Sequence, residues 1–164
     1  MIVVGRAIVI EQDNVDTDVL YPGAYLNIDD AEKMKAHLFE GLDPSLRDQF
    51  GGVTILVVGE NFGTGSSREH VPQAMRASGV RCLVGKSFAR IFYRNCINLG
   101  LPAVTCLEAV EAAEPGSSMS VDPATGEVRI GEKRFEAGPI PPFMLEMLDA
   151  GGLVAWGERR LAAT

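Results

Sequence analysis

Apolar residues gather in short runs separated by glycine- and proline-rich segments, and four of these runs predict buried strands. They span 2–10, 53–58, 80–84 and 101–107, and each is rich in valine, isoleucine or leucine. The run at 53–58 (VTILVV) lacks the apolar–polar alternation of a half-exposed strand. Such continuous runs are typical of strands covered on both faces, as in parallel sheets.

Helical spacing lies between these runs. The segment from Asp30 to Glu40 predicts a helix capped by Asp29 or Asp30, and helices are also expected over 66–78 and 87–99. The segment EQDNVDTDVLYPG after the first strand is expected to be an irregular loop. Alternating strands and helices of these lengths indicate parallel pairing with right-handed crossovers.

The last third of the chain has a different pattern. Two alternating runs around Thr125-Gly126 predict a β-hairpin. PPFMLEMLDAGG predicts a helix with Pro141 or Pro142 in its first turn, and residues 154–156 suggest a final short strand. We therefore expect a single α/β domain over 1–164, with a mainly parallel central sheet, crossover helices and an additional small β-layer.

Composition narrows the range of partners. The 164 residues carry a net charge of −7, which disfavours nucleic acid and anionic membrane surfaces as partners. No apolar run approaches the ~20 residues of a membrane span. The opening MIVVGRAIVI is short and contains Arg6, so we expect a strand rather than a secretory signal, and a cytoplasmic location. Cys82, Cys96 and Cys106 are too scattered for a disulfide framework, so core packing and no metal site are expected.

The segment GENFGTGSSREH, residues 59–70, is the strongest candidate for chemistry. It joins a buried strand to a predicted helix through three glycines, with Ser66 and Ser67 expected at the N-cap and first helical positions. Such a turn directs backbone N–H groups and the positive end of a helix dipole towards an anion, and Arg68 adds a cation. The glycine spacing matches neither a Walker loop nor a dinucleotide-binding fingerprint, and no G-x-S-x-G is present.

Longer stretches carry a family resemblance. The block GENFGTGSSREHVPQAMRASGVRCLVGKSFARIFYRNCINLGLP and the loop DNVDTDVLYPGAYL resemble the swivelling domain of the aconitase superfamily. Both are similar to the short, separately encoded small subunits of isopropylmalate isomerase and homoaconitase. The resemblance implies a three-layer β/β/α swivelling domain. It also implies a hydro-lyase subunit of leucine biosynthesis that isomerises 2- and 3-isopropylmalate by dehydration and rehydration.

The resemblance assigns roles residue by residue. It implies that Ser66 is the general base and that Ser67 and Arg68 hold a substrate carboxylate. It also implies that Thr17 and Asp18 bind substrate from the active-site loop facing the cluster-bearing domains. A [4Fe–4S] cluster is implied on a large partner subunit, with none bound by this chain. His70 is expected to make a structural hydrogen bond.

The loop Tyr25, Leu26, Asn27 and Ile28 matches the family's specificity loop. Neutral Asn27 replaces an arginine common in homoaconitase-like members, which favours an apolar substituent over a third carboxylate. Citramalate and dimethylmalate stay open as substrates, and homoaconitate is disfavoured. Thr64 stands where the family commonly has cysteine. A non-catalytic carboxylate-binding module is the alternative, and homo-oligomers are expected when the chain is isolated. His37 is expected to face solvent.

Overall fold

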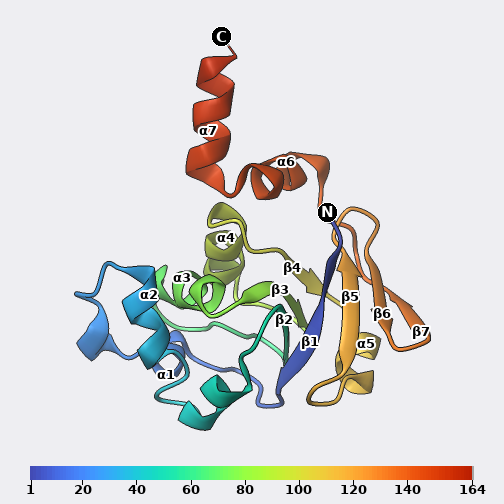
Figure 1. The fold of residues 1–164 in the computed structure, drawn as a ribbon, viewed down its shortest axis with the longest axis horizontal. Coiled ribbons are helices and arrows are strands. Elements are labelled where there is room, and N and C mark those ends of the chain that lie inside the picture. Colours follow the sequence, from blue (N-terminus) through green and yellow to red (C-terminus); the bar gives the residue numbers. More distant parts are fainter. Residues whose placement is uncertain (164) are drawn as a thin grey trace.

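Seven strands form one curled sheet in the computed structural model, which describes residues 1–163 (Figure 1). The strands are β1 (Val3–Ile10), β2 (Thr54–Val58), β3 (Val80–Gly85), β4 (Ala103–Thr105), β5 (Ser118–Asp122), β6 (Glu127–Ile130) and β7 (Lys133–Glu136). Their order across the sheet is β4-β3-β2-β1-β5-β6-β7. The first four pair in parallel and the last three continue the sheet in antiparallel pairing.

The helices follow the strands along the chain and pack against the faces of the sheet. The α-helices are α1 (Thr17–Leu20), α2 (Ala31–Met34), α3 (His70–Ala77), α4 (Arg90–Asn98), α5 (Leu107–Ala112), α6 (Pro142–Ala150) and α7 (Leu153–Ala162). Short 3₁₀ turns occupy Gly23–Tyr25, Lys35–His37 and Pro44–Gln49. Figure 1 shows α7 standing away from the body of the molecule beyond α6.

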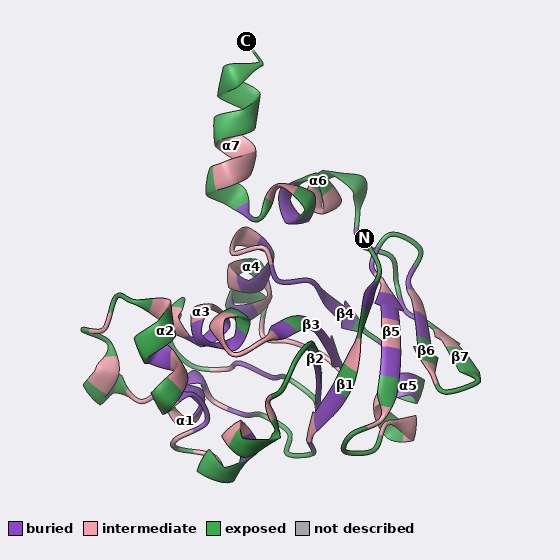
Figure 2. Ribbon diagram, viewed as in Figure 1, coloured by how far each residue is buried: buried purple, intermediate pink, exposed green. Residues whose placement is uncertain are grey.

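The sheet separates two hydrophobic clusters, and β2 contributes to both. Leu56 and Val58 pack with residues of α3 and α4 on one face. Ile55 and Val57 pack on the other face with residues of α5, α6 and the β5–β6 hairpin. All five residues of β2 are buried, as Figure 2 shows for the centre of the sheet. Burial on both faces is the physical reason why the sequence of β2 lacks alternation.

The α/β class and the mainly parallel core are confirmed. The four apolar runs became β1 to β4, and the hairpin around Thr125-Gly126 became β5 and β6. A third strand, β7, follows the hairpin, and all three strands extend the same sheet. The helix with Pro142 at its start is confirmed as α6, which ends at Gly151 in the left-handed conformation.

Two helices begin later than predicted. Helix α3 starts at His70 instead of Ser66, which places Pro72 in its first turn, where a missing N–H costs no intrahelical bond. Helix α4 starts at Arg90 instead of Ser87. The residues before it pair with the glycine-rich turn through a bridge between Phe62 and Phe88.

The remaining differences concern short segments. Residues 154–156 were wrongly predicted as a strand and lie in α7. The helix predicted over 30–40 has Asp30 as its N-cap, but it becomes a 3₁₀ turn at Lys35 and ends before Phe39, whose φ is 65°. The loop after β1 contains the four-residue helix α1. Within residues 1–163, no helix has the length and apolar character that crossing a membrane requires.

Candidate active site

The parallel strands β1, β2 and β3 bring their carboxyl ends to one edge of the sheet, where ligands bind in open α/β folds. Backbone hydrogen bonds join the loops that follow β1 and β2. The N–H groups of Gly63 and Thr64 donate to Val15 O at 2.8 and 3.1 Å, and Thr17 N donates to Thr64 O at 2.9 Å. The two motifs noted in the sequence therefore form one connected site.

Ser66 lies at the surface of this site, and a hydrogen bond from Thr17 holds its backbone. The Thr17 hydroxyl donates to the Ser66 carbonyl at 2.8 Å, and Thr17 is only 2% exposed. The Ser66 side chain is exposed, and its hydroxyl makes no hydrogen bond within residues 1–163. The structure therefore fixes the position of Ser66 and leaves its hydroxyl available to a ligand.

The glycine-rich turn needs its glycines for conformation and for space. Gly63 and Gly65 have φ of +88° and +89°, in the left-handed region. A Cβ on Gly63 would lie 2.2 Å from the Phe92 ring, and one on Gly65 would lie 2.6 Å from the Asp16 carboxylate. No hydrogen bond occupies the N–H groups of 65, 66 and 67 in the described part of the chain. These N–H groups remain available to an anion.

The predicted helix N-terminus at the serines is wrong. Ser66 lies in a bend and Ser67 in irregular structure, and the residue before α3 is Glu69, which makes no side-chain cap hydrogen bond. The dipole of α3 therefore begins about one turn beyond Ser66, and such effects fall off within a turn. Stabilisation of an anion at Ser66 thus rests more on the free N–H groups of the turn than on the helix.

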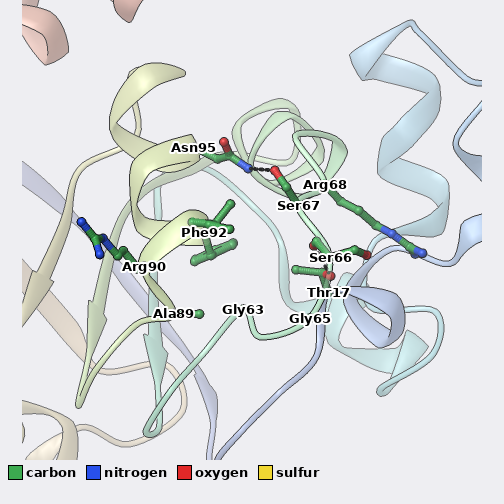
Figure 3. A pocket seen from close by; sticks show the side chains of 11 residues that line it. Thr17, Gly63, Gly65, Ser66, Ser67, Arg68, Ala89, Arg90, Phe92 and Asn95 are labelled. Atoms are coloured by element: carbon green, nitrogen blue, oxygen red, sulfur yellow. Dashed lines mark hydrogen bonds between the residues drawn. The ribbon is translucent and has the colours of Figure 1, made fainter.

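Arg68 lies in the same loop, and its guanidinium contacts Tyr21 and Asp18. Its guanidinium donates to Tyr21 O at 2.7 Å and pairs with Asp18 at 2.6 Å. The Arg68 side chain is 14% exposed, whereas that of Asp18 is 60% exposed. Figure 3 shows the guanidinium directed away from Phe92, so Arg68 borders the site with its stem while its charged end is paired.

A cavity of about 180 Å³ lies between the serine loop and the start of α4 (Figure 3). It is open to solvent on one side. Its lining consists of Thr17, Gly63, Gly65, Ser66, Ser67, Arg68, Ala89, Arg90, Ile91, Phe92 and Asn95. Typical small-molecule pockets enclose ~300–1,000 Å³, so this cavity has the size of a partial site.

Helix α4 contributes residues to this cavity that the sequence did not indicate. The Asn95 side chain donates to Ser67 Oγ at 3.0 Å. Ile91 and Asn95 are four residues apart, a spacing that places them on one face of a helix. That spacing was visible in the sequence, but nothing in it indicated that this face meets the serine loop.

The predicted specificity loop, Tyr25 to Ile28, does not line the cavity. Tyr25 O accepts a 2.7 Å hydrogen bond from the Tyr21 hydroxyl, and Ile28 O lies 3.1 Å from His70 Nε2. Leu26 and Asn27 are exposed. Because the Tyr21 carbonyl also binds Arg68, the side chains of Tyr21 and His70 connect the loop to the site.

The two histidines have structural contacts. His70 bonds to the loop as described, which agrees with the structural role expected for it. His37 does not simply face solvent: its ring stacks on Tyr25 with centroids 3.6 Å apart, and its Nδ1 lies 3.5 Å from Glu40. Glu40 raises the pKa of Tyr25 through a hydrogen bond and its charge. His37 therefore helps to fix Tyr25, the first residue of the predicted specificity loop.

The cysteines do not form a ligand set. Cys82, Cys96 and Cys106 are all buried. Burial raises the pKa of Cys82 to about 12 and that of Cys96 higher still, so both thiols stay protonated and unsuited to bind a metal. Residues 1–163 contain no group of three or more His, Cys, Asp or Glu side chains placed to hold a metal ion.

Comparison with known proteins places this geometry in a family. The model of the aconitase C-terminal domain matches residues 46–109, which include the serine loop and α4. The 3-isopropylmalate dehydratase small subunit of Caldanaerobacter subterraneus is 49% identical over 151 residues, covering 91% of this chain and 94% of the relative. The small subunit 1 from Methanopyrus kandleri is 48% identical over 145 residues, covering 87% and 85%.

A solved structure agrees with the fold. The 3-isopropylmalate dehydratase from Methanocaldococcus jannaschii superimposes with a TM-score of 0.92 at 35% identity, covering 99% of this chain and 97% of its own. These names do not favour the citramalate, dimethylmalate and homoaconitate alternatives or a non-catalytic module. The shared sequence and fold show that this chain belongs to the family of 3-isopropylmalate dehydratase small subunits.

Proposed function

We propose that this chain is the small subunit of a 3-isopropylmalate dehydratase, a hydro-lyase of leucine biosynthesis that interconverts 2- and 3-isopropylmalate together with a large subunit. The family membership carries the proposal. The open cavity beside an exposed, unpartnered Ser66 supports it, because a site of this size and openness needs a second surface to enclose a substrate.

In this proposal Ser66 is the general base. Its alkoxide takes the proton from the carbon beside a substrate carboxylate, and the released electron pair forms a carbon–carbon double bond as hydroxide leaves the neighbouring carbon and takes up a proton from solvent to become water. In the return step a water molecule adds its hydroxide to the carbon that lost the proton and releases a proton to solvent, while Ser66 returns its proton to the carbon that lost the hydroxyl, which gives the isomer. The unoccupied N–H groups at 65–67 support this role, since they stabilise negative charge at the serine.

The neighbouring residues hold the substrate in this proposal. Ser67 donates to a carboxylate, and Arg68 adds charge once its guanidinium exchanges Asp18 for the substrate. Thr17 mainly holds the backbone of the serine loop, because its hydroxyl donates its hydrogen to the Ser66 carbonyl. Asp18, the more exposed member of its ion pair, faces the partner.

The iron–sulfur cluster implied by the family does not fit this chain. Its three thiols are buried, and no described cluster of side chains has the ligands a [4Fe–4S] centre requires. We therefore assign the cluster to the large subunit. The proposed location is the cytoplasm, in line with three free cysteines.

Anaerobic co-expression with an aconitase-type large subunit tests the proposal. The complex should interconvert the isopropylmalates, and neither subunit should do so alone. Ser66→Ala should lower kcat by about 10²–10⁴-fold, the range of general-base catalysis, without loss of assembly. Ser78→Ala, at the far end of α3, is the matched control and should be fully active. Activity of this chain without a partner, or an unchanged Ser66→Ala enzyme, contradicts the proposal.

Substrate choice is the second part of the proposal. We infer that the loop of Tyr25, Leu26, Asn27 and Ile28 borders the substituent of the substrate. Its Ile28 carbonyl lies 3.1 Å from His70 Nε2, and its Tyr25 carbonyl accepts from the hydroxyl of Tyr21, whose own carbonyl binds Arg68. Assays with isopropylmalate, citramalate, dimethylmalate and homocitrate compare the candidates. Asn27→Arg should improve the relative kcat/KM for the tricarboxylate, and an unchanged ratio means that this loop does not meet substrate.

A further inference from the structure

Asn95 joins the serine loop to helix α4. It is partly buried on the side of α4 that lines the cavity, and its side-chain amide donates to Ser67 Oγ at 3.0 Å. The two residues come from the segments after β3 and β2, so the bond crosses the site (Figure 3). This is the only hydrogen bond recorded for the Ser67 hydroxyl within residues 1–163.

The direction of this bond determines what Ser67 does. A serine hydroxyl carries one hydrogen and can both donate and accept. Because the Asn95 amide nitrogen supplies the hydrogen between them, the hydroxyl hydrogen of Ser67 remains free. A substrate carboxylate has only acceptor atoms. Ser67 can bind it only if that hydrogen is directed at the substrate and not at a protein acceptor.

We propose that Asn95 is a positioning residue that makes Ser67 a hydrogen-bond donor to the substrate carboxylate. This inference rests on the proposed function and deepens it. An acceptor at position 95 would instead draw the Ser67 hydrogen away from the cavity. The charged residues lining the cavity are Arg68 and Arg90. Arg68 is paired with Asp18, and Figure 3 shows Arg90 directed away from the serines, so neither takes the place of Asn95 beside Ser67.

Asn95→Asp tests the direction of the bond in the assembled enzyme. An ionised aspartate can only accept, so Ser67 turns towards it and KM for 3-isopropylmalate should rise at least tenfold at pH 8, with a smaller change in kcat. As the pH falls towards about 4, the ordinary range of an aspartate, the acid form regains a donor. The ratio of the KM of Asn95→Asp to that of the wild type should therefore shrink between pH 8 and pH 5.

Three comparisons make the result specific. Asn95→Ala should show a raised KM whose ratio to wild type stays constant with pH. Asn98→Asp introduces the same charge on the same helix outside the cavity lining, and should leave KM unchanged. Binding of isopropylmalate to complexes that also carry Ser66→Ala, measured by calorimetry, should reproduce the pH-dependent loss for Asn95→Asp without any turnover.

The outcomes separate the inference from the proposed function. A wild-type complex that does not isomerise isopropylmalate contradicts the proposed function itself. An active wild-type complex with a pH-independent KM ratio for Asn95→Asp, or with wild-type KM in both Asn95 variants, overturns the role of Asn95. Thermal unfolding and size-exclusion chromatography establish that each variant folds and assembles. If Asn95→Asp fails either check, an Asn95→Ala enzyme with wild-type KM is sufficient to overturn the inference.

Discussion

The Thr17 hydroxyl offers a direct test of how the protein holds its serine loop. Thr17→Val replaces this hydroxyl with a methyl group of nearly the same size and removes the 2.8 Å hydrogen bond to Ser66 O. Losing such a bond costs about 1 kcal/mol of stability, since water reaches the carbonyl of the exposed Ser66. For a chain of this size, 1 kcal/mol lowers Tm by about 2–4 °C.

The effect on catalysis should be larger than the effect on stability. Ser66 must meet the reacting carbon closely, and a displacement of about 1 Å at a reacting group costs on the order of 10²-fold in rate. We therefore expect Thr17→Val to lower kcat of the assembled enzyme at least tenfold, although the chain remains folded and assembles.

Thr17→Ser is the matched control, because it keeps the hydroxyl and removes a methyl group. Burial of one such group is worth about 0.8 kcal/mol, so the two variants should be destabilised by similar amounts in urea titrations. Only Thr17→Val should lose kcat. Equal kcat values for the two variants would refute the idea that this hydrogen bond positions Ser66.

Three further predictions concern other parts of the molecule. Gly65→Ala should lower the free energy of unfolding by about 1–3 kcal/mol, because it combines a φ of +89° with a contact at Asp16; a wild-type urea midpoint would contradict this. The pKa of Cys82 is about 12 against an ordinary 9.0, so above about pH 9 the unfolded chain loses a proton that the folded chain keeps. Stability should therefore fall from pH 9 to pH 11, less steeply in Cys82→Ala, and equal slopes in urea titrations would exclude this thiol as a cause. Arg68→Lys cannot reproduce the paired contacts to Tyr21 and Asp18 and should raise KM for isopropylmalate with little change in Tm, whereas an unchanged KM would argue against carboxylate binding.

The strands were predictable because burial on both faces of a strand requires a continuous run of apolar residues, which is visible in the sequence. β2 lies between two hydrophobic clusters, so its residues 55–58 are all apolar and show no apolar–polar alternation. Helix starts were less predictable. Ser66 resembles an N-cap by residue type, but Pro72 shows that a helix beginning at 66 would place a proline in its interior. A helix that keeps Pro72 in its first turn begins near His70, which is where α3 starts.

Contacts between distant segments account for what the sequence could not reveal. The segment from Ser87 to Ala89 has helical spacing, yet its backbone pairs with Phe62 of the glycine-rich turn. Tertiary pairing thus overrides local propensity at this position. The contact between Asn95 and Ser67 has the same origin, since it depends on how α4 meets the loop after β2. The roles of Ser66 and Arg68 were inferred from family resemblance and stay predictions until the variants are measured.

The backbone bonds between the loops after β1 and β2 also govern when the site forms during folding. Val15 accepts from Gly63 and Thr64 only once β1 and β2 lie side by side, so the serine loop acquires its shape together with the centre of the sheet. Its protected amides should exchange with solvent only through global unfolding, whereas those of the exposed α7 exchange earlier. We therefore expect the free small subunit to carry a preformed half-site, and its assembly with a partner to need docking without a folding step.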